Sequence, residues 1–142
     1  MPLTTHPIKA EAGSFILNGS HRSDTIVDAI QYADRNGGAT IWRKEKFTPK
    51  NVGRYIVAVG PRGIVIGEGA TLREKLNAVR EVLAGTNEDT TIVGVGLWFD
   101  FARMIHIEPV CSFRSLFDAE RFASALNEEY IWDRKEQKEI PM

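Results

Sequence analysis

Residues 90–109 read TTIVGVGLWFDFARMIHIEP, and this stretch decides the fold of the chain. Apolar residues alternate with other residues up to a corner at residues 99–102, FDFA, and the alternation resumes at residues 104–107, MIHI. Alternation of this kind is typical of strands that bury one face. The stretch therefore predicts an antiparallel hairpin, and Asp100 in its corner is of the residue type that caps turns.

The next stretch, residues 112–127, reads SFRSLFDAERFASALN and changes to the spacing of a helix. Apolar residues recur three and four positions apart, which places them on one helical face. These residues are Phe113, Leu116 or Phe117, Ala119, Phe122, Ala123 and Leu126. Residues 130–133, YIWD, predict a short closing strand.

Two more helices are predicted upstream, each marked by residues that begin or end helices. The first follows Ser20 or Ser23, which can cap its free amides, and it ends at the glycines of residues 37–38. The second begins at a capping box, residues 71–74, and ends at Gly85. Three strands joined by turns are expected between the two helices, at residues 39–42, 54–59 and 64–66.

This order of elements predicts the fold class. Adjacent strands joined by tight turns favour a mostly antiparallel sheet of about five to six strands. With three helices on one face of that sheet, the expected fold is an α+β two-layer sandwich. We expect a single domain over residues 23–133, an N-terminal tail with an optional edge strand over residues 1–22, and a charged C-terminal tail over residues 134–142.

Composition excludes several classes of function. The chain has 142 residues and a formal net charge of -1, so no global field attracts it to nucleic acid or to an anionic membrane. Its longest apolar run, residues 92–99, is far shorter than the roughly 20 residues that span a bilayer. The N-terminus lacks the pattern of a secretory signal, so a cytoplasmic location is expected. Cys111 is the single cysteine, which excludes an intrachain disulfide.

One local segment, residues 42–54, is basic. It interleaves five positive residues with Trp42 and Phe47 and contains one acidic residue, Glu45. The positive residues are Arg43, Lys44, Lys46, Lys50 and Arg54. Such a pattern can bind a phosphate backbone or an acidic protein, and it is equally the pattern of a solvated loop between strands.

Two candidate reaction centres lie in or next to the hairpin. His106 and Glu108 alternate in a strand and share a face, so they could act as acid and base, or form a cross-strand polar pair. Cys111 precedes a helix and could form a thiolate, or it could be a small buried residue. A third metal ligand is not evident, and neither a metal nor a cofactor is predicted.

The tryptophans supply the remaining candidates. Trp42, Trp98 and Trp132 are residues that usually pack in a core or on a sheet face, but exposed aromatic side chains mark partner surfaces. If Trp98 and Trp132 are exposed on one sheet face, that face is the expected interaction surface, together with His106.

Over residues 25–133 the chain resembles small accessory proteins of actinobacterial bacteriophages. The likeness lies in residues 37–40, GGAT, in residues 55–59, YIVAV, and in residues 127–133, NEEYIWD. The resemblance implies an accessory role in the host cytoplasm, such as interference with a host or defence component, and it carries no catalytic activity. We therefore expect a non-enzymatic protein that binds a host or phage protein or associates with itself. Nucleic-acid binding through residues 42–54 and a small enzyme using His106 with Glu108, or Cys111, remain the alternatives.

Overall fold

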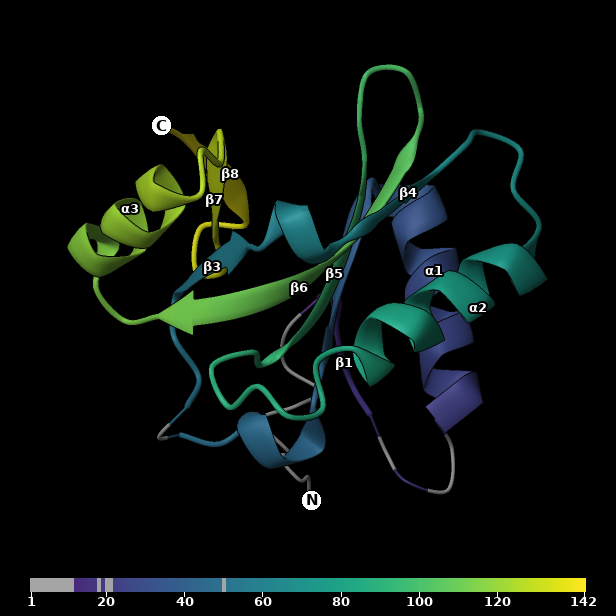
Figure 1. The fold of residues 1–142 in the computed structure, drawn as a ribbon, viewed down its shortest axis with the longest axis horizontal. Helices are drawn as coiled ribbons and strands as arrows, with labels where there is room; N and C mark the ends of the chain where they lie inside the picture. The colour runs from purple at the N-terminus through teal and green to yellow at the C-terminus, as the bar shows by residue number, and fades with distance from the viewer. Residues whose placement is uncertain (1–11, 18, 20–21, 50) are drawn as a thin grey trace.

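A computed structural model describes residues 12–17, 19, 22–49 and 51–142. In this part of the chain one sheet of eight strands carries three α-helices (Figure 1). The strands are β1 (Ser14–Ile16), β2 (Gly38–Trp42), β3 (Tyr55–Ala58), β4 (Ile64–Ile66), β5 (Gly94–Phe99), β6 (Ile105–Phe113), β7 (Tyr130–Asp133) and β8 (Lys138–Pro141). The helices are α1 (Arg22–Asn36), α2 (Leu72–Ala84) and α3 (Leu116–Ala125), with the short 3-10 turns η3 (Lys44–Lys46) and η4 (Gly60–Arg62).

The strand order is β1-β2-β5-β6-β3-β7-β8, and β4 pairs with β6 beside β3. β1 and β2 are parallel, whereas the remaining pairs are antiparallel. The α+β class is confirmed. The prediction of a two-layer sandwich with about five to six strands was wrong, because the sheet has more strands and curls into a half-barrel. Twist accumulates from strand to strand, so adding strands at both edges favours curling.

The long strand β6 contacts α2 near its start and α3 near its end, and α1 lies beside α2 on the same side of the sheet. Its residues Ile105 and Ile107 pack against the apolar faces of α1 and α2, and Cys111 packs against α3. These positions have odd numbers, so the helices lie on the same side of β6. The opposite side of the sheet is covered at one end by Phe47 and Val52 from the segment between β2 and β3, where Phe47 packs on Trp42.

Several local predictions are confirmed. The capping box of Thr71 and Glu74 begins α2, and Gly37, with a φ of 94°, follows the last residue of α1. The predicted hairpin is β5 and β6. Ser20 lies outside the described residues, while Ser23 lies within α1.

Two predictions need correction. The expected charged tail over residues 134–142 contains β8, in which Ile140 pairs with Ile131 of β7. Phe113, predicted to lie on the helical face, is the last residue of β6; of the alternatives Leu116 and Phe117, Leu116 packs in the core and Phe117 is 65% exposed. None of the helices in the described part of the chain has both the length and the apolar character needed to cross a membrane.

Candidate functional site

The corner of the β5–β6 hairpin, residues 100–104, extends beyond the neighbouring strands as the long green loop at the top of Figure 1. We call these residues the hairpin tip. β2 ends its pairing at Trp98, and β4 ends its pairing at Ile105, so the tip has no flanking strand. Phe101 lies in the tip and is fully exposed, at 106% of the reference surface. The tip therefore presents a large apolar side chain to the solvent.

Asp100 fixes the conformation of the tip. Its Oδ1 accepts hydrogen bonds from the backbone N–H groups of Ala102 at 2.9 Å and Met104 at 3.0 Å. The backbone N–H groups of Arg103 and Asp100 close the turn on the carbonyls of Asp100 and Met104. Arg103 has a φ of 62°, in the left-handed region. The turn thus holds a backbone conformation that a non-glycine residue seldom adopts, and the bonds to Asp100 stabilise it.

His106 connects this aspartate to the sheet. Its Nε2 lies 2.8 Å from Asp100 Oδ2, and its Nδ1 lies 3.6 Å from Glu108 Oε2. The imidazole is stacked parallel to Trp98, its cross-strand partner, with ring centroids 6.0 Å apart. The hydrogen bond from His106, and then those from Met104 and Ala102, lower the pKa of Asp100, so this carboxylate stays ionised.

Glu108 lies in a niche that two glycines make possible. A Cβ on Gly63 would lie 2.4 Å from Glu108 Cγ, and a Cβ on Gly60 would lie 3.4 Å from Glu108 Oε2. Glu108 is 6% exposed, and within the described residues its Oε1 has no hydrogen-bond partner. Burial, and then the charge of Glu128, raise the pKa of Glu108. Glu128 itself accepts from the Gly60 N–H at 3.3 Å.

This geometry brings together one of the predicted pairs. His106 and Glu108 do share a face, and the structure adds Asp100 and Glu128 to them. Their arrangement can hold a proton between imidazole and carboxyl groups. In the part of the chain that the structure describes, no group of three or more His, Cys, Asp or Glu residues is arranged to hold a metal ion.

The base of the tip carries further exposed groups. Arg103 lies over the ring of Phe99, with its guanidinium carbon 5.6 Å from the centroid, and its Nε lies 3.4 Å from Glu68 Oε2. Both ionic side chains are exposed, so this ion pair contributes little to stability. Val65 of β4 pairs with His106 and is 49% exposed. It adds a second apolar side chain near the base of the tip.

The basic segment, residues 42–54, is engaged in the fold at most of its predicted binding residues. Lys46 donates to the carbonyl of Thr90 at 2.8 Å. Arg54 binds Asp133 through two hydrogen bonds, at 2.9 Å and 2.8 Å. Lys44 is exposed, and Lys50 lies outside the described residues. Nucleic-acid binding through this segment therefore remains a prediction with Lys44 as its exposed cation.

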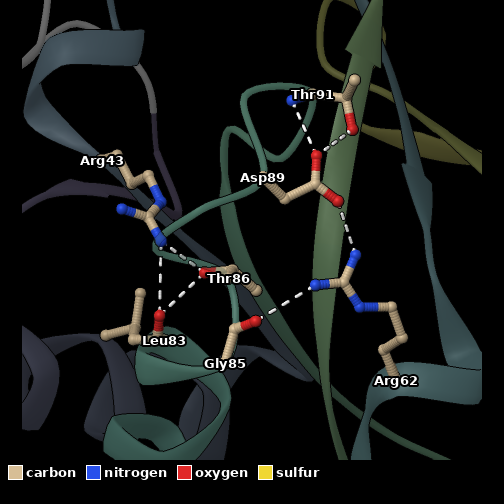
Figure 2. Close-up of polar contacts among 7 residues, drawn as sticks. All are labelled: Arg43, Arg62, Leu83, Gly85, Thr86, Asp89 and Thr91. Carbon is tan, nitrogen blue, oxygen red and sulfur yellow. Dashed lines mark hydrogen bonds and ion pairs between the residues drawn. The ribbon is translucent and has the colours of Figure 1, made fainter.

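Arg43 belongs to a polar network at the C-terminal end of α2 (Figure 2). Its guanidinium donates to the carbonyl of Leu83 and to the hydroxyl of Thr86. Arg62 reaches the same loop from η4, donating to the carbonyl of Gly85 at 3.2 Å and to Asp89 at 2.7 Å. Cations favour the negative end of a helix dipole, so the two arginines stabilise this helix end. We interpret the network as structural.

Cys111 lies on the helix side of the sheet and is buried. Burial raises the pKa of its thiol to about 11, and the hydrogen bond with Thr91 opposes this shift. The environment therefore favours the neutral thiol over the nucleophilic thiolate at physiological pH.

The two candidate tryptophans share a sheet face but lie at opposite ends of it. Trp98 pairs with Gly38 of β2, whereas Trp132 pairs with Ile56 of β3. Trp132 is half-buried and packs in the cluster around Trp42. Trp98 is half-buried as well, over Gly96, where an added Cβ would lie 3.0 Å from its Cζ3. They do not form one exposed aromatic patch.

Sequence reasoning identified Asp100 as a turn cap but missed Phe101 as an exposed residue. The available signal was its position, because an apolar residue inside a predicted two-strand corner has no strand face to occupy. Comparisons with protein-family models, with curated proteins and with solved structures gave no match.

Proposed function

We propose that this chain is a protein-binding protein that contacts its partner through the hairpin tip, with Phe101 as the anchor. The observation that carries the proposal is a fully exposed Phe101 on a turn that Asp100 fixes. Aromatic anchors that enter a partner's pocket supply much of the binding free energy at interfaces. A turn that is already ordered loses less conformational entropy on binding, which favours affinity.

The environment of Phe101 differs from that of the other strongly exposed phenylalanine. The ring of Phe117 lies on α3 beside Arg121, whose guanidinium carbon is 5.7 Å from the centroid. Phe101 projects from the end of a hairpin, where it can enter a cavity that a flat helix surface cannot reach. A suitable partner is a protein with an apolar pocket that accepts Phe101. Val65 would then contact the edge of that pocket.

This function agrees with the accessory role that the phage resemblance implies. The partner class would then be a host or defence protein in the host cytoplasm. The alternative partner of the tip is a second copy of this chain. Sedimentation of the purified protein distinguishes it from a host protein, because self-association would make the sedimentation coefficient depend on concentration.

The test places a photo-crosslinking phenylalanine analogue at position 101 or, as a matched control, at position 117. Each tagged protein is irradiated in a nuclease-treated and in an untreated lysate of an actinobacterial host. We expect a specific crosslinked protein from position 101 alone, in both lysates, and competition by the unlabelled wild type. Phe101→Ala should weaken this competition by about 30-fold or more, which corresponds to an anchor residue of about 2 kcal/mol. Phe117→Ala should compete like the wild type.

Equal competition by Phe101→Ala and the wild type would overturn the proposal. Crosslinks that vanish on nuclease treatment would also overturn it, because they would indicate nucleic acid as the partner.

A further inference from the structure

We propose that His106 is the positioning residue of the hairpin tip: held between Asp100 and Glu108, it locks the turn that presents Phe101, and the lock responds to pH. This inference rests on the proposed function only for its consequence in binding. The lock itself follows from contacts among described residues and has a readout of its own.

A hydrogen bond joins His106 to Asp100. Asp100 uses Oδ1 for two backbone N–H groups of the tip and Oδ2 for His106 Nε2. The carboxylate can hold the tip in place only if its own rotation is fixed. Within the contacts described for Asp100, His106 is the group that ties this carboxylate to the sheet, because the other two bonds lie within the turn itself. The order of the tip should therefore depend on the imidazole.

The second ring nitrogen of His106, Nδ1, faces Glu108. Nε2 faces an ionised carboxylate, so Nε2 carries a hydrogen and donates. In a neutral imidazole Nδ1 would then be an acceptor, and it faces Glu108 Oε2 at 3.6 Å. Two acceptors facing each other repel, so the arrangement is stable when one proton lies between them, either on Nδ1 or on Glu108.

Carboxyl groups from three segments surround His106. Three carboxyl groups act on the site: Asp100 from the tip, Glu108 from β6 itself, and Glu128 from the segment after α3. The neighbouring strands contribute uncharged residues, Trp98 of β5 and Val65 of β4. Burial, and then the charge of Glu128, raise the pKa of Glu108, which favours its protonated form.

The direction of the pH response follows from this arrangement. When Glu108 ionises as pH rises, its carboxylate and an unprotonated Nδ1 repel, the ring shifts, and its bond to Asp100 weakens. The tip should be ordered at mildly acidic pH and less ordered at alkaline pH. Since the pKa of Asp100 is lowered, the tip should stay ordered at pH values below those at which an aspartate usually gains a proton.

The experiment measures amide hydrogen exchange by NMR at Ala102 and Met104, whose N–H groups bind Asp100. His106→Phe keeps an aromatic ring beside Trp98 but removes the donor, and protection at both amides should fall by about tenfold, the effect of one charge-assisted hydrogen bond. His106→Gln keeps a donor that does not titrate, so protection should be retained without pH dependence. Comparison at each pH cancels the intrinsic pH dependence of exchange.

Amides of Lys135 and Glu136 form an internal control, because they bind the Asp133 carboxylate and not Asp100. Wild-type protection at Met104 in His106→Phe would overturn the positioning role, and identical pH profiles for the wild type and His106→Gln would overturn the pH response. If His106→Phe loses protection while Phe101→Ala still competes normally for the crosslink, the lock stands and the proposed binding function fails. If His106→Phe keeps wild-type protection while Phe101→Ala no longer competes for the crosslink, the proposed binding function stands and the role of His106 is excluded.

Discussion

Gly63 shows how one residue makes room for the candidate site. Its φ is -97°, so a side chain would be accepted by the backbone, and the constraint is purely steric. An added Cβ would lie 2.4 Å from Glu108 Cγ and 2.8 Å from the carbonyl oxygen of Ile107. Neither contact can be relieved by rotating the end of a flexible side chain. The glycine is thus required by the position of Glu108 and of β6.

We expect Gly63→Ala to destabilise the protein by about 2 kcal/mol, the usual effect of forcing an extra carbon into a packed site. The free energy of unfolding from urea titration measures this loss. Gly67→Ala is the matched control, because no atom lies within 4 Å of a Cβ at Gly67 and its backbone has no positive φ. Equal stability of the two variants would contradict the steric account of the niche.

At the scale of elements, two hairpins are each stabilised by an aspartate that binds backbone amides of the turn. Asp100 in the β5–β6 hairpin binds backbone amides two and four residues later. Asp133 at the β7–β8 turn binds the amides of Lys135 at 3.0 Å and Glu136 at 3.2 Å. Each aspartate is also tied to a side chain, His106 in the first case and Arg54 in the second. The first aspartate is thus tied to β6 of its own hairpin, and the second to the residue that precedes β3.

The second of these aspartates makes stability depend on pH. The hydrogen bonds from Arg54, and then those from the backbone amides, lower the pKa of Asp133 from 3.8 to about 2. A folded-state pKa below the unfolded value stabilises the fold above about pH 4, and this contribution is lost as pH falls through about 2. We expect Asp133→Asn to reduce stability at pH 7 by about 2 kcal/mol and to flatten the acid limb of the stability curve.

Thermal unfolding followed between pH 2 and pH 7 measures this effect. Glu139→Gln is the control, because Glu139 is an exposed residue of the same hairpin. If the stability of Asp133→Asn fell with decreasing pH as steeply as that of the wild type, another group would be responsible for the pH dependence. Asp89, whose pKa is also lowered to about 2 by Thr91 and Arg62, would then be the next residue to test.

At the scale of the whole molecule, the curled sheet depends on strands from both ends of the described chain. β1 adds to β2, and β8 adds to β7, where Ile140 packs against the cluster that contains Ile131 and the buried face of α3. Removing β8 would expose Ile131 and leave the edge of β7 unpaired. Residues 138–142 are therefore part of the folded domain and not a tail.

We expect truncation after Gln137 to lower the free energy of unfolding by about 2 kcal/mol, because it removes one apolar contact layer and the pairing of β7. Chemical denaturation of the truncated chain measures this loss. Glu139→Ala should leave stability nearly unchanged, since Glu139 is exposed. A truncated chain as stable as the full one would restore the interpretation of these residues as a tail.

Local patterns in the sequence were sufficient to predict the helices, the central hairpin, the capping box at Thr71 and the role of Asp100, because propensity, spacing and turn chemistry act over a few residues. The tertiary structure alone decided the strand count, the curl of the sheet, the exposure of Phe101, the burial of Glu108 and the approach of Glu128 to it. Pairing such as Ile131 with Ile140, and the niche that Gly63 leaves for Glu108, join segments whose contacts depend on the packing of the whole chain. Alternation along one strand predicted that His106 and Glu108 share a face, but no local spacing encodes which distant residues lie beside them, and that is the physical reason why the groups around this pair appeared only in the folded molecule.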